Sequence, residues 1–291
     1  MTTRGSQYIP YLLIAPALIL ILIFVFYPTL YGFQLSLSEQ VPVTGEFRLI
    51  GLTNFRNLLT NPEFLGTLAV TFKFAVFYVA IAIVLGLALA LVMNLKLQFT
   101  GTYLTIIFIP WVLSDVVAGI IWRWMFNQSV GLIELTLRRL HISPAVGMLA
   151  SPTGVIAVMV FLAVWRSLPF TMLLLLAGLQ AISEELQEAA KIDGASAWNR
   201  LWSVTLPLLR PQLLVITLLL SIGAINASGI FLTVTDGGPG RSSEVTALYM
   251  YHTAFRFFQL TQGSAIAVIM FLINLTLTLI YLRIFRSEYQ I

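Results

Sequence analysis

Residues 188–207 read EAAKIDGASAWNRLWSVTLP, a polar stretch that separates two long apolar runs. Ser183, just before it, can cap the start of a helix, and Glu184 and Glu188 place negative charge near the positive end of that helix. Gly194 can end the helix, because glycine readily adopts the left-handed conformation found after a helix C-terminus. The stretch therefore predicts a short polar helix that stops at a glycine.

A second short helix is predicted to begin at Ser196 and to carry Trp198 and Trp202. We expect it to stop before Pro207, since proline can begin the next helix but cannot continue this one. Two short helices that meet at a glycine form a compact projection. The small side chains of Ala189 and Ala190 would let another protein approach the backbone of this projection closely.

The spacing of this stretch resembles the EAA loop of permease subunits in ATP-binding-cassette (ABC) importers. That loop reads Glu-Ala-Ala, three residues, Gly, nine residues, Ile, one residue, Leu-Pro, and only Val204 departs from it here. Asp193-Gly194-Ala195 is frequent in the carbohydrate-uptake branch. The alternative is a helix-turn-helix connector that merely satisfies its own caps. The resemblance implies that the residues coupled to an ATPase are Glu188, Ala189, Ala190, Asp193, Gly194, Leu206 and Pro207.

The composition indicates a membrane protein. Hydrophobic residues make up 59% of the 291 residues and charged residues 10%, whereas soluble domains have about 25% charged residues. The absence of cysteine excludes disulfides, thiolate metal sites and thiol catalysis, and the distance in sequence between His141 and His252 argues against a histidine metal site. Because the basic residues are scattered, the net charge of +4 does not indicate a nucleic-acid partner.

Six charge-poor runs are long enough to cross a bilayer, for which a helix needs about 20 residues. They occupy approximately residues 9–33, 74–94, 103–124, 155–182, 211–233 and 260–282. No linker, low-complexity segment or clear internal repeat divides the chain. The sequence therefore predicts an all-α membrane protein with a single domain, residues 1–291.

Basic residues orient these spans, because cytoplasmic segments carry an excess of them. The terminal side has Arg4, Lys96, Lys191, Arg200, Arg210, Arg283 and Arg286 in four short segments, and the opposite side has Arg48, Arg56, Arg138, Arg139, Arg241 and Arg256 in three longer ones. The numbers of basic residues on the two sides are nearly equal, but the terminal side has more of them per residue of connecting segment. We therefore expect both termini and residues 184–207 in the cytoplasm.

The amino-terminal apolar run resembles a signal peptide, because Ala15-Pro16-Ala17 looks like a cleavage site. The run continues well beyond that point to Tyr27, so we expect it to be retained as the first span. Between the first two spans, apolar residues at helical spacing from Leu52 to Leu59 predict a short helix. It would either lie on the outer membrane surface or pack as an ordinary loop helix.

Polar residues within the spans are the candidates for the substrate pathway, since ionisable groups in a membrane usually face a bundle interior or a wet cavity. Arg166 lies midway along the fourth span beside Trp165. It could bind sugar hydroxyls or an anionic group, with Trp165 stacking on a pyranose face, or it could form a structural ion pair with Asp115. Asn226 and Asn274 could contact substrate or form hydrogen bonds between helices.

The chain has no GxxxxGK[ST] phosphate loop, so the energy for transport must come from a partner. The resemblance implies the type I ABC importer permease arrangement, with six transmembrane helices and cytoplasmic coupling helices between spans 4 and 5. It also implies a cytoplasmic ATPase dimer that binds ATP and Mg, a second homologous permease, usually a different chain, and an external solute-binding protein. The chain itself would carry no cofactor and would lie in lipid, in a bacterial or archaeal plasma membrane.

A sugar or an oligosaccharide is the expected substrate, and a non-sugar solute such as glycerol 3-phosphate, a phosphodiester or a polyol is the alternative. Two other classes of protein are alternatives to an importer. A membrane-embedded enzyme is disfavoured, because Asp115, Arg123 and Arg166 lack a nucleophile or metal partner. A channel or an independent carrier would work without ATP, and co-purification of an ATPase distinguishes it from an importer.

Overall fold

The computed structural model describes residues 9–41, 44–95, 98–142 and 144–286. Arg4 and Lys96, two of the basic residues expected on the cytoplasmic side, lie outside these residues, and of Arg286 only the backbone is described. The fold divides into two compact units. One runs up to Asn61 and includes Met250–Phe271; the other comprises Pro62–Tyr249 and the chain from Leu272 onward.

The first unit starts with a helical run that contains one π-helical turn. The run consists of α1 (Ile9–Ile21), η2 (Leu22–Phe26) and α2 (Tyr27–Ser36). A two-stranded antiparallel hairpin follows, in which β1 (Ser38–Gln40) pairs with β2 (Phe47–Leu49) so that Ser38 faces Leu49. Its later part contains the π-helix η4 (His252–Arg256) and the start of α15 (Leu260–Arg286).

The short helix predicted after the hairpin is α3 (Thr53–Thr60). Asn54 and Leu58 are its buried residues, so Leu58 of the predicted apolar set packs, whereas Leu52 and Leu59 are exposed. Asn54 donates hydrogen bonds from Nδ2 to the carbonyl oxygens of Ser36 at 3.0 Å and Ser38 at 2.8 Å. These buried bonds satisfy the backbone where α2 meets β1, so a polar residue shares the packed face of α3 with Leu58.

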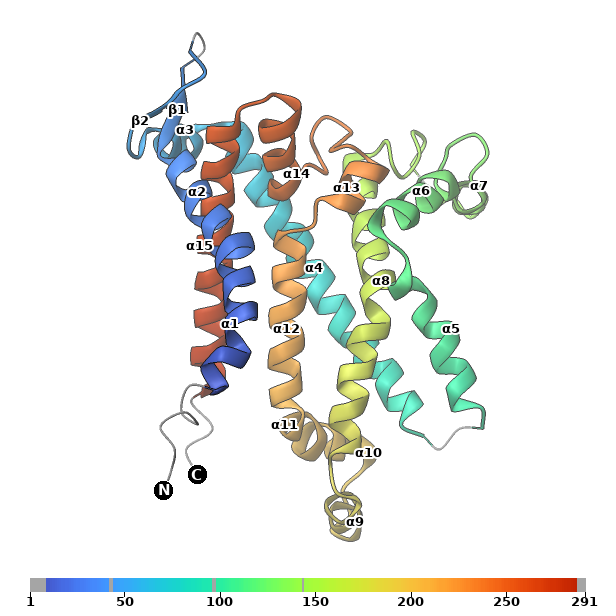
Figure 1. Cartoon of the computed structure of the whole chain (residues 1–291). Helices are drawn as coiled ribbons and strands as arrows, with labels where there is room; N and C mark the ends of the chain where they lie inside the picture. The colour runs from blue at the N-terminus through green and yellow to red at the C-terminus, as the bar shows by residue number, and fades with distance from the viewer. Residues whose placement is uncertain (1–8, 42–43, 96–97, 143, 287–291) are drawn as a thin grey trace, which may run out of the picture. The chain divides into compact units, whose positions relative to one another are not determined.

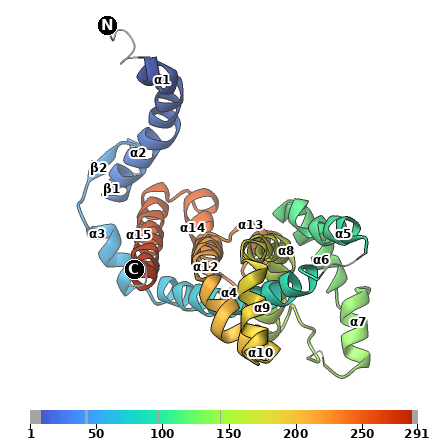
Figure 2. The same ribbon diagram turned by 90° about the horizontal axis from the view of Figure 1, so that it is seen from below.

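The second unit is built on three helices that lie side by side in Figures 1 and 2. They are α4 (Pro62–Met93), α8 (Pro152–Gln180) and α12 (Arg210–Ile225). The buried residues of α4 recur every three or four positions, as they must on one face of a helix. Gly86 lies against the side chain of Thr171 on α8, and this small residue lets the two backbones approach.

Shorter helices complete the second unit around α4, α8 and α12. They are α5 (Thr100–Val112), α6 (Asp115–Met125), α7 (Leu132–Arg139), α9 (Glu184–Ile192), α10 (Ala197–Arg200), η3 (Leu201–Thr205), α11 (Leu206–Leu208) and α13 (Gly229–Val234). The unit boundary between Tyr249 and Met250 falls within α14 (Thr246–Tyr251). Phe74 on α4 and Phe231 on α13 meet edge to face at 4.9 Å, which joins α13 to the core.

Four of the described helices are each long and apolar enough to cross a membrane. They are Tyr11–Ser36, Pro62–Met93, Pro152–Gln180 and Leu260–Ile284. Two bent pairs also qualify when each pair is taken together: Thr100–Val112 with Asp115–Met125, bent by 94°, and Ala197–Leu208 with Arg210–Ile225, bent by 70°. The described chain is therefore a mostly helical membrane protein with four to six candidate spans.

The run at 103–124, predicted to be one helix, is two helices. α5 ends at Val112 and α6 begins at Asp115 after a bend of 94°. Ser114 causes the restart, because its Oγ accepts a hydrogen bond at 3.3 Å from the backbone N–H of Val117 and so caps α6. Asp115 in the first turn adds favourable charge there.

Two other helices have ends that differ from those of the predicted spans. The helix that contains the span predicted from residue 74 begins at Pro62, since an exposed lysine such as Lys73 can keep its ammonium in water while its stem lies along the helix. The helix predicted for 211–233 ends at Ile225, and α13 is a separate helix from Gly229. Asn226 forms the C-cap of α12, and its side-chain amide donates to the carbonyl oxygen of Ile222 at 2.8 Å.

Candidate functional site

The first helix of the predicted loop is α9, which starts at Glu184 as expected. Ser183 has the extended backbone of an N-cap residue, but its side chain makes no capping hydrogen bond, which differs from the prediction. Glu184 and Glu185 occupy the first turn, where negative charge interacts favourably with the helix dipole. The charge, rather than a serine cap, therefore favours the helix start.

Gly194 ends α9 in the manner predicted. It has φ +78°, a conformation that side chains with a Cβ rarely adopt. The N–H of Ala195 donates to the carbonyl oxygen of Ala190 at 3.0 Å, and the N–H of Gly194 donates to that of Lys191 at 3.0 Å. These two bonds form a Schellman motif, which satisfies carbonyls that the end of the helix would leave unpaired. Asp193 is the C-cap residue.

The second helix starts where predicted but does not stop before Pro207. Ser196 caps α10 by accepting a hydrogen bond from the N–H of Asn199 at 3.2 Å. The chain then passes through the π-helix η3 into α11, so that Pro207 lies within a continuing helix. A π-helical turn shifts the hydrogen-bond ladder by one residue, which accommodates the missing N–H of the proline. The 70° bend follows Leu208 instead.

Two contacts that the motif did not predict brace the loop. Gln187 on α9 donates from Nε2 to Oγ1 of the buried Thr205 at 3.3 Å. Arg200 on α10 donates from a terminal guanidinium nitrogen to the carbonyl oxygen of Ala195 at 2.9 Å. Gln187 precedes the motif and Thr205 occupies one of its variable positions, so nothing in the pattern points to them. Together these contacts make α9 and the helices after it a connected projection.

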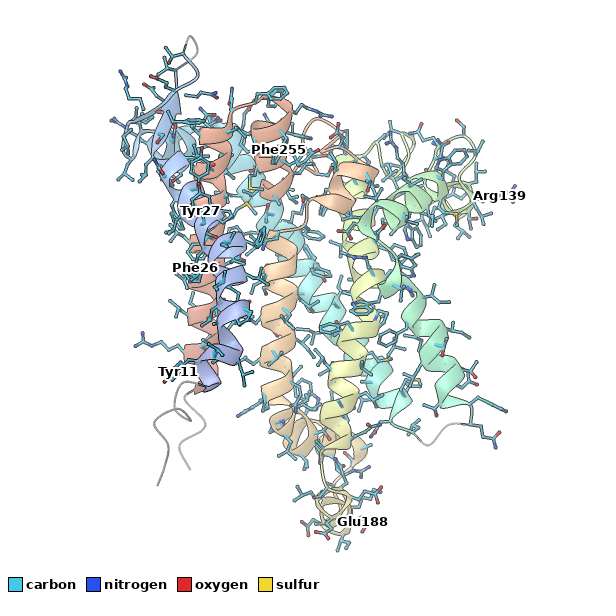
Figure 3. All side chains as sticks on the ribbon, in the orientation of Figure 1. Tyr11, Phe26, Tyr27, Arg139, Glu188 and Phe255 are labelled. Atoms are coloured by element: carbon cyan, nitrogen blue, oxygen red, sulfur yellow. The ribbon has the colours of Figure 1, made fainter. Side chains whose placement is uncertain are left out.

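The outer face of this projection is open and partly apolar. None of the residues of α9 is buried, and Ile192 is 85% exposed. Figure 3 shows Glu188 on this helix, which projects beyond the ends of α8 and α12. Trp198 and Trp202 pack edge to face at 5.7 Å and both are exposed. An apolar, aromatic surface with charges around it is typical of a protein interface.

The opposite side of α9 borders a groove of about 910 Å³. Gln187 and Lys191 line it from α9, Asn94 lines it from just beyond the end of α4, and Trp198 lines it from α10. Glu188 and Ala189 do not line this groove and are exposed. Glu188 and Ala189 therefore lie on a free surface, whereas Ala190 is half-buried and Gln187 and Lys191 face the rest of the second unit.

The intramembrane candidates Arg166 and Asp115 form an ion pair between α8 and α6. Arg166 also donates from Nε to the carbonyl oxygen of Leu113 at 3.3 Å, at the bend between α5 and α6. The side chains are 37% and 39% exposed. The ion pair is the one that the structural alternative predicted. The bond to Leu113 at the bend was not predicted, and both side chains stay partly accessible. A contact between Arg166 and substrate stays a prediction.

The remaining pathway candidates are not joined to this pair. Trp165 packs edge to face against Trp122 at 5.1 Å. Asn226 binds within its own helix, as described above. Asn274 lies half-buried on α15, and its Oδ1 has no hydrogen-bond partner among the described residues. In the same part of the chain, no hydrogen bond or ion pair links either amide to Arg166 or Asp115.

Comparison with known proteins identifies the family that this chain resembles. The profile of the family described as "Binding-protein-dependent transport system inner membrane component" matches residues 82–287. A trehalose/maltose transport system permease protein, MalF, of Thermococcus litoralis is 38% identical over 279 residues, covering 95% of this chain and 93% of its own length.

Two further relatives have other named substrates. The sulfoquinovosyl glycerol transport system permease protein SmoG of Agrobacterium fabrum is 35% identical, covering 98% of this chain and 92% of its own. The sn-glycerol-3-phosphate transport system permease protein UgpA of the same organism is 32% identical, covering 94% and 93%.

A solved structure shares the fold. A chain of a bacterial ABC transporter involved in import of the acidic polysaccharide alginate superimposes with a TM-score of 0.84 at 19% identity, covering 98% of both chains. At that identity the likeness concerns the fold alone. In a second structure, the alginate transporter is in complex with an alginate pentasaccharide-bound periplasmic protein.

Proposed function

Since the chain belongs to the binding-protein-dependent transport system inner membrane components, we propose that it forms half of the translocation pathway of an ATP-driven importer for a sugar or an oligosaccharide. The relatives named for trehalose/maltose and for sulfoquinovosyl glycerol support a carbohydrate. The relative named for glycerol 3-phosphate keeps that substrate as the alternative. The observation that carries the ATP-driven part of the proposal is the exposed, braced loop at residues 184–207.

In this proposal α9 is the coupling helix between spans 4 and 5. Ala189 and Ala190 permit close docking of a cytoplasmic ATPase, Glu188 supplies a polar contact, and Gly194 provides the tight turn. The ATPase dimer binds ATP and Mg and carries out the hydrolysis, while this chain holds no cofactor. The absence of a phosphate-binding loop from the sequence supports this division of labour.

The loop is suited to transmit movement to the bundle. Closing of the ATPase dimer would press on α9, and the bond from Gln187 to Thr205 would carry that movement into η3. Leu206 and Pro207 lie in α11, immediately before the 70° bend into α12. Because the bond from Gln187 connects α9 to the helices just before this bend, a displacement of α9 would tilt α12. That tilt would change the side of the membrane to which the pathway is open.

The membrane arrangement is part of the proposal. Each of the two bent helix pairs counts as one span, which gives six spans, both termini in the cytoplasm and one permease domain over the whole chain. A second homologous permease, expected to be a different chain, completes the pathway in a bacterial or archaeal plasma membrane. An external solute-binding protein delivers the substrate. The complex of the alginate transporter with its periplasmic protein supports this last partner by analogy.

Arg166 and Trp165 are the proposed substrate contacts on α8, with Asp115 beside them and with Asn226 and Asn274 as further candidates. A guanidinium can donate several hydrogen bonds to sugar hydroxyls. The half-exposed side chain of Arg166 supports access by a polar ligand even while it pairs with Asp115. No position in this set needs to bind a metal ion.

The proposal is tested by reconstituting the chain with the subunits that accompany it and measuring ATP hydrolysis. We expect hydrolysis to increase when the external binding protein is loaded with one of a panel of oligosaccharides. Stimulation by glycerol 3-phosphate alone would support the alternative substrate. A chain that purifies without an ATPase and transports solute without ATP would contradict the proposal.

A further inference from the structure

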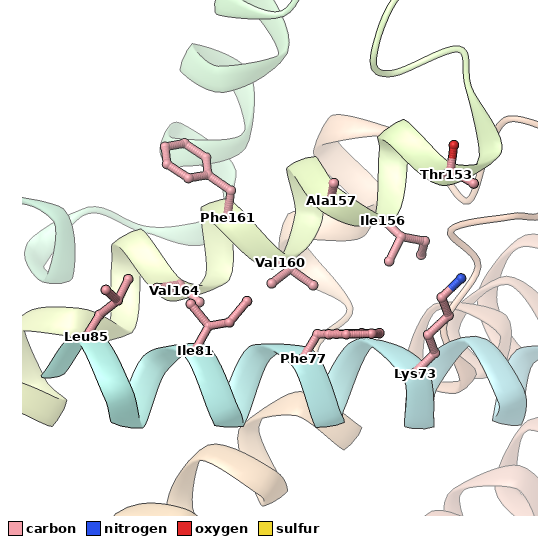
Figure 4. A pocket seen from close by; sticks show the side chains of 10 residues that line it. All are labelled: Lys73, Phe77, Ile81, Leu85, Thr153, Ile156, Ala157, Val160, Phe161 and Val164. Atoms are coloured by element: carbon pink, nitrogen blue, oxygen red, sulfur yellow. The ribbon is translucent and has the colours of Figure 1, made fainter. Parts of the chain in front are cut away.

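An apolar groove of about 410 Å³ runs between α4 and α8, within the second unit (Figure 4). Apolar side chains of the two helices form its walls: Phe77, Ile81, Leu85, Ile156, Ala157, Val160, Phe161 and Val164. Lys73 and Thr153 line it as well, and Figure 4 shows them together at one end. The groove thus has a long apolar section and a short polar end.

The wall contributed by α4 is a single row inclined to the helix axis, because Lys73, Phe77, Ile81 and Leu85 recur at every fourth position. At about 1.5 Å per residue, the row is about 18 Å long. One leaflet, half of a hydrocarbon core about 30 Å thick, has a similar depth. Phe77, Ile81 and Phe161 are exposed, so the groove opens to the surface of two helices that can each cross a membrane. The shape therefore suits one acyl chain.

The charge at the polar end suits a phosphate. The side chain of Lys73 is exposed, and no carboxylate in the described ranges pairs with it. Thr153 lies in the first turn of α8, so the ammonium of Lys73 stands level with the end of a candidate span, where lipid headgroups lie. The positive end of the α8 dipole favours an anion at the same place. The Thr153 hydroxyl lies 3.2 Å from Ser151 Oγ, and it can accept a hydrogen bond from that serine while it donates its own proton to the anion.

We propose that this groove binds an anionic phospholipid, with one acyl chain along Phe77, Ile81 and Val160 and the headgroup phosphate on Lys73 and Thr153. A wholly apolar ligand would leave Lys73 without an anionic partner. A transmembrane helix of another protein, about 10 Å wide with its side chains, would fit a groove of this volume only if α4 and α8 separated. The proposal concerns lipid recognition and does not depend on which solute is transported.

The test uses the full-length chain, purified in detergent with the subunits that accompany it, and native mass spectrometry. The probes are phosphatidylglycerol and a diacylglycerol with the same acyl chains, which lacks the phosphate. Lys73→Gln should weaken phosphatidylglycerol binding about fivefold, the size expected for one basic residue near a membrane surface, and leave diacylglycerol binding unchanged. Ala157→Phe, which fills the groove, should lower the binding of both lipids.

Arg139→Gln is the matched control, because Arg139 is an exposed cation on α7 and does not line the groove. It should leave both lipids bound as in the unaltered chain. Equal phosphatidylglycerol binding by the Lys73→Gln and unaltered chains would overturn the proposal. So would efficient cross-linking of Ile81→Cys, in a chain without native cysteine, to a second permease, because a protein would then occupy the groove.

Discussion

Gly194 combines a backbone requirement with an open surface. Its φ of +78° disfavours any residue with a Cβ, yet a Cβ built there would meet nothing within 4 Å of this chain. A substitution therefore costs the chain only local strain, roughly 1 kcal/mol for a residue such as alanine. Any larger functional effect must arise from a partner that contacts this surface.

Arg166 and Asp115 allow a structural role to be separated from a role in substrate binding. We expect Arg166→Gln and Asp115→Asn each to lower the melting temperature of the complex, because each leaves one partner of a half-exposed ion pair. Solvent limits the cost to about 1 kcal/mol. The double variant should recover part of the loss, since no unpaired charge remains. Thermal unfolding of all four proteins measures this coupling.

Transport kinetics of the same variants test substrate contact. If Arg166 binds substrate, the KM should rise in both variants that lack Arg166 and should stay unchanged in Asp115→Asn. Equal KM values throughout would restrict Arg166 to the clamp at the bend of α5 and α6. Additive losses of stability in the double variant would instead contradict the ion pair.

At the scale of elements, the packing of α4 against α8 depends on a small residue at one point. A Cβ at Gly86 would lie 2.5 Å from Cγ2 of Thr171, whereas a Cβ at Gly66 on the same helix would meet nothing within 4 Å. The same change from glycine to alanine therefore has different consequences at the two positions. The apolar groove that Lys73 lines also lies between α4 and α8.

Gly86→Ala should destabilise the protein by about 1 to 3 kcal/mol, because it overpacks the contact with α8. Gly66→Ala should be neutral or stabilising by up to about 1 kcal/mol, because alanine is the better helix former. Melting temperatures in one detergent compare the two. A Gly86→Ala protein as stable as the Gly66→Ala protein would contradict the close approach of the helices.

Hydropathy predicted the elements whose ends coincide with charges or turns. The predicted runs at 155–182 and 260–282 match α8 and α15 within a few residues, because charged or turn-forming residues flank them. The sequence contains a signal for the break at Ser114, because a serine followed by an aspartate is typical of a helix start. Hydropathy averaged over a long apolar run does not reveal such a local cap. A single lysine likewise gave a false start for α4.

The sequence predicted the turn in the loop at residues 184–207 but not the hydrogen bonds that connect its helices. Gly194 and the cap at Ser196 follow from local chemistry, so the sequence contains them. The π-turn before Pro207 and the bond between Gln187 and Thr205 depend on how α9 folds against η3. The pairing of Arg166 with Asp115 was one of two readings, because the sequence does not show which helices meet.

At the scale of the whole molecule, the proposed topology places Ile192 and Val130 on opposite sides of the membrane. Both side chains are exposed, and the chain has no native cysteine. On intact cells, a membrane-impermeant maleimide should label Val130→Cys and not Ile192→Cys, and inverted vesicles should reverse the result. Labelling of both positions from one side would contradict the span count, and the reversed pattern would contradict the orientation.

The central claim is that residues 184–207 couple this permease to an ATPase, and Gly194 tests it most directly. The measurement is substrate-stimulated ATP hydrolysis by the reconstituted complex with Gly194→Val, compared with Gly51→Val, a positive-φ glycine whose Cβ would also meet nothing within 4 Å. We predict that stimulation is lost in Gly194→Val and kept in Gly51→Val, with both chains folded. Full stimulation in the Gly194→Val complex would contradict the account.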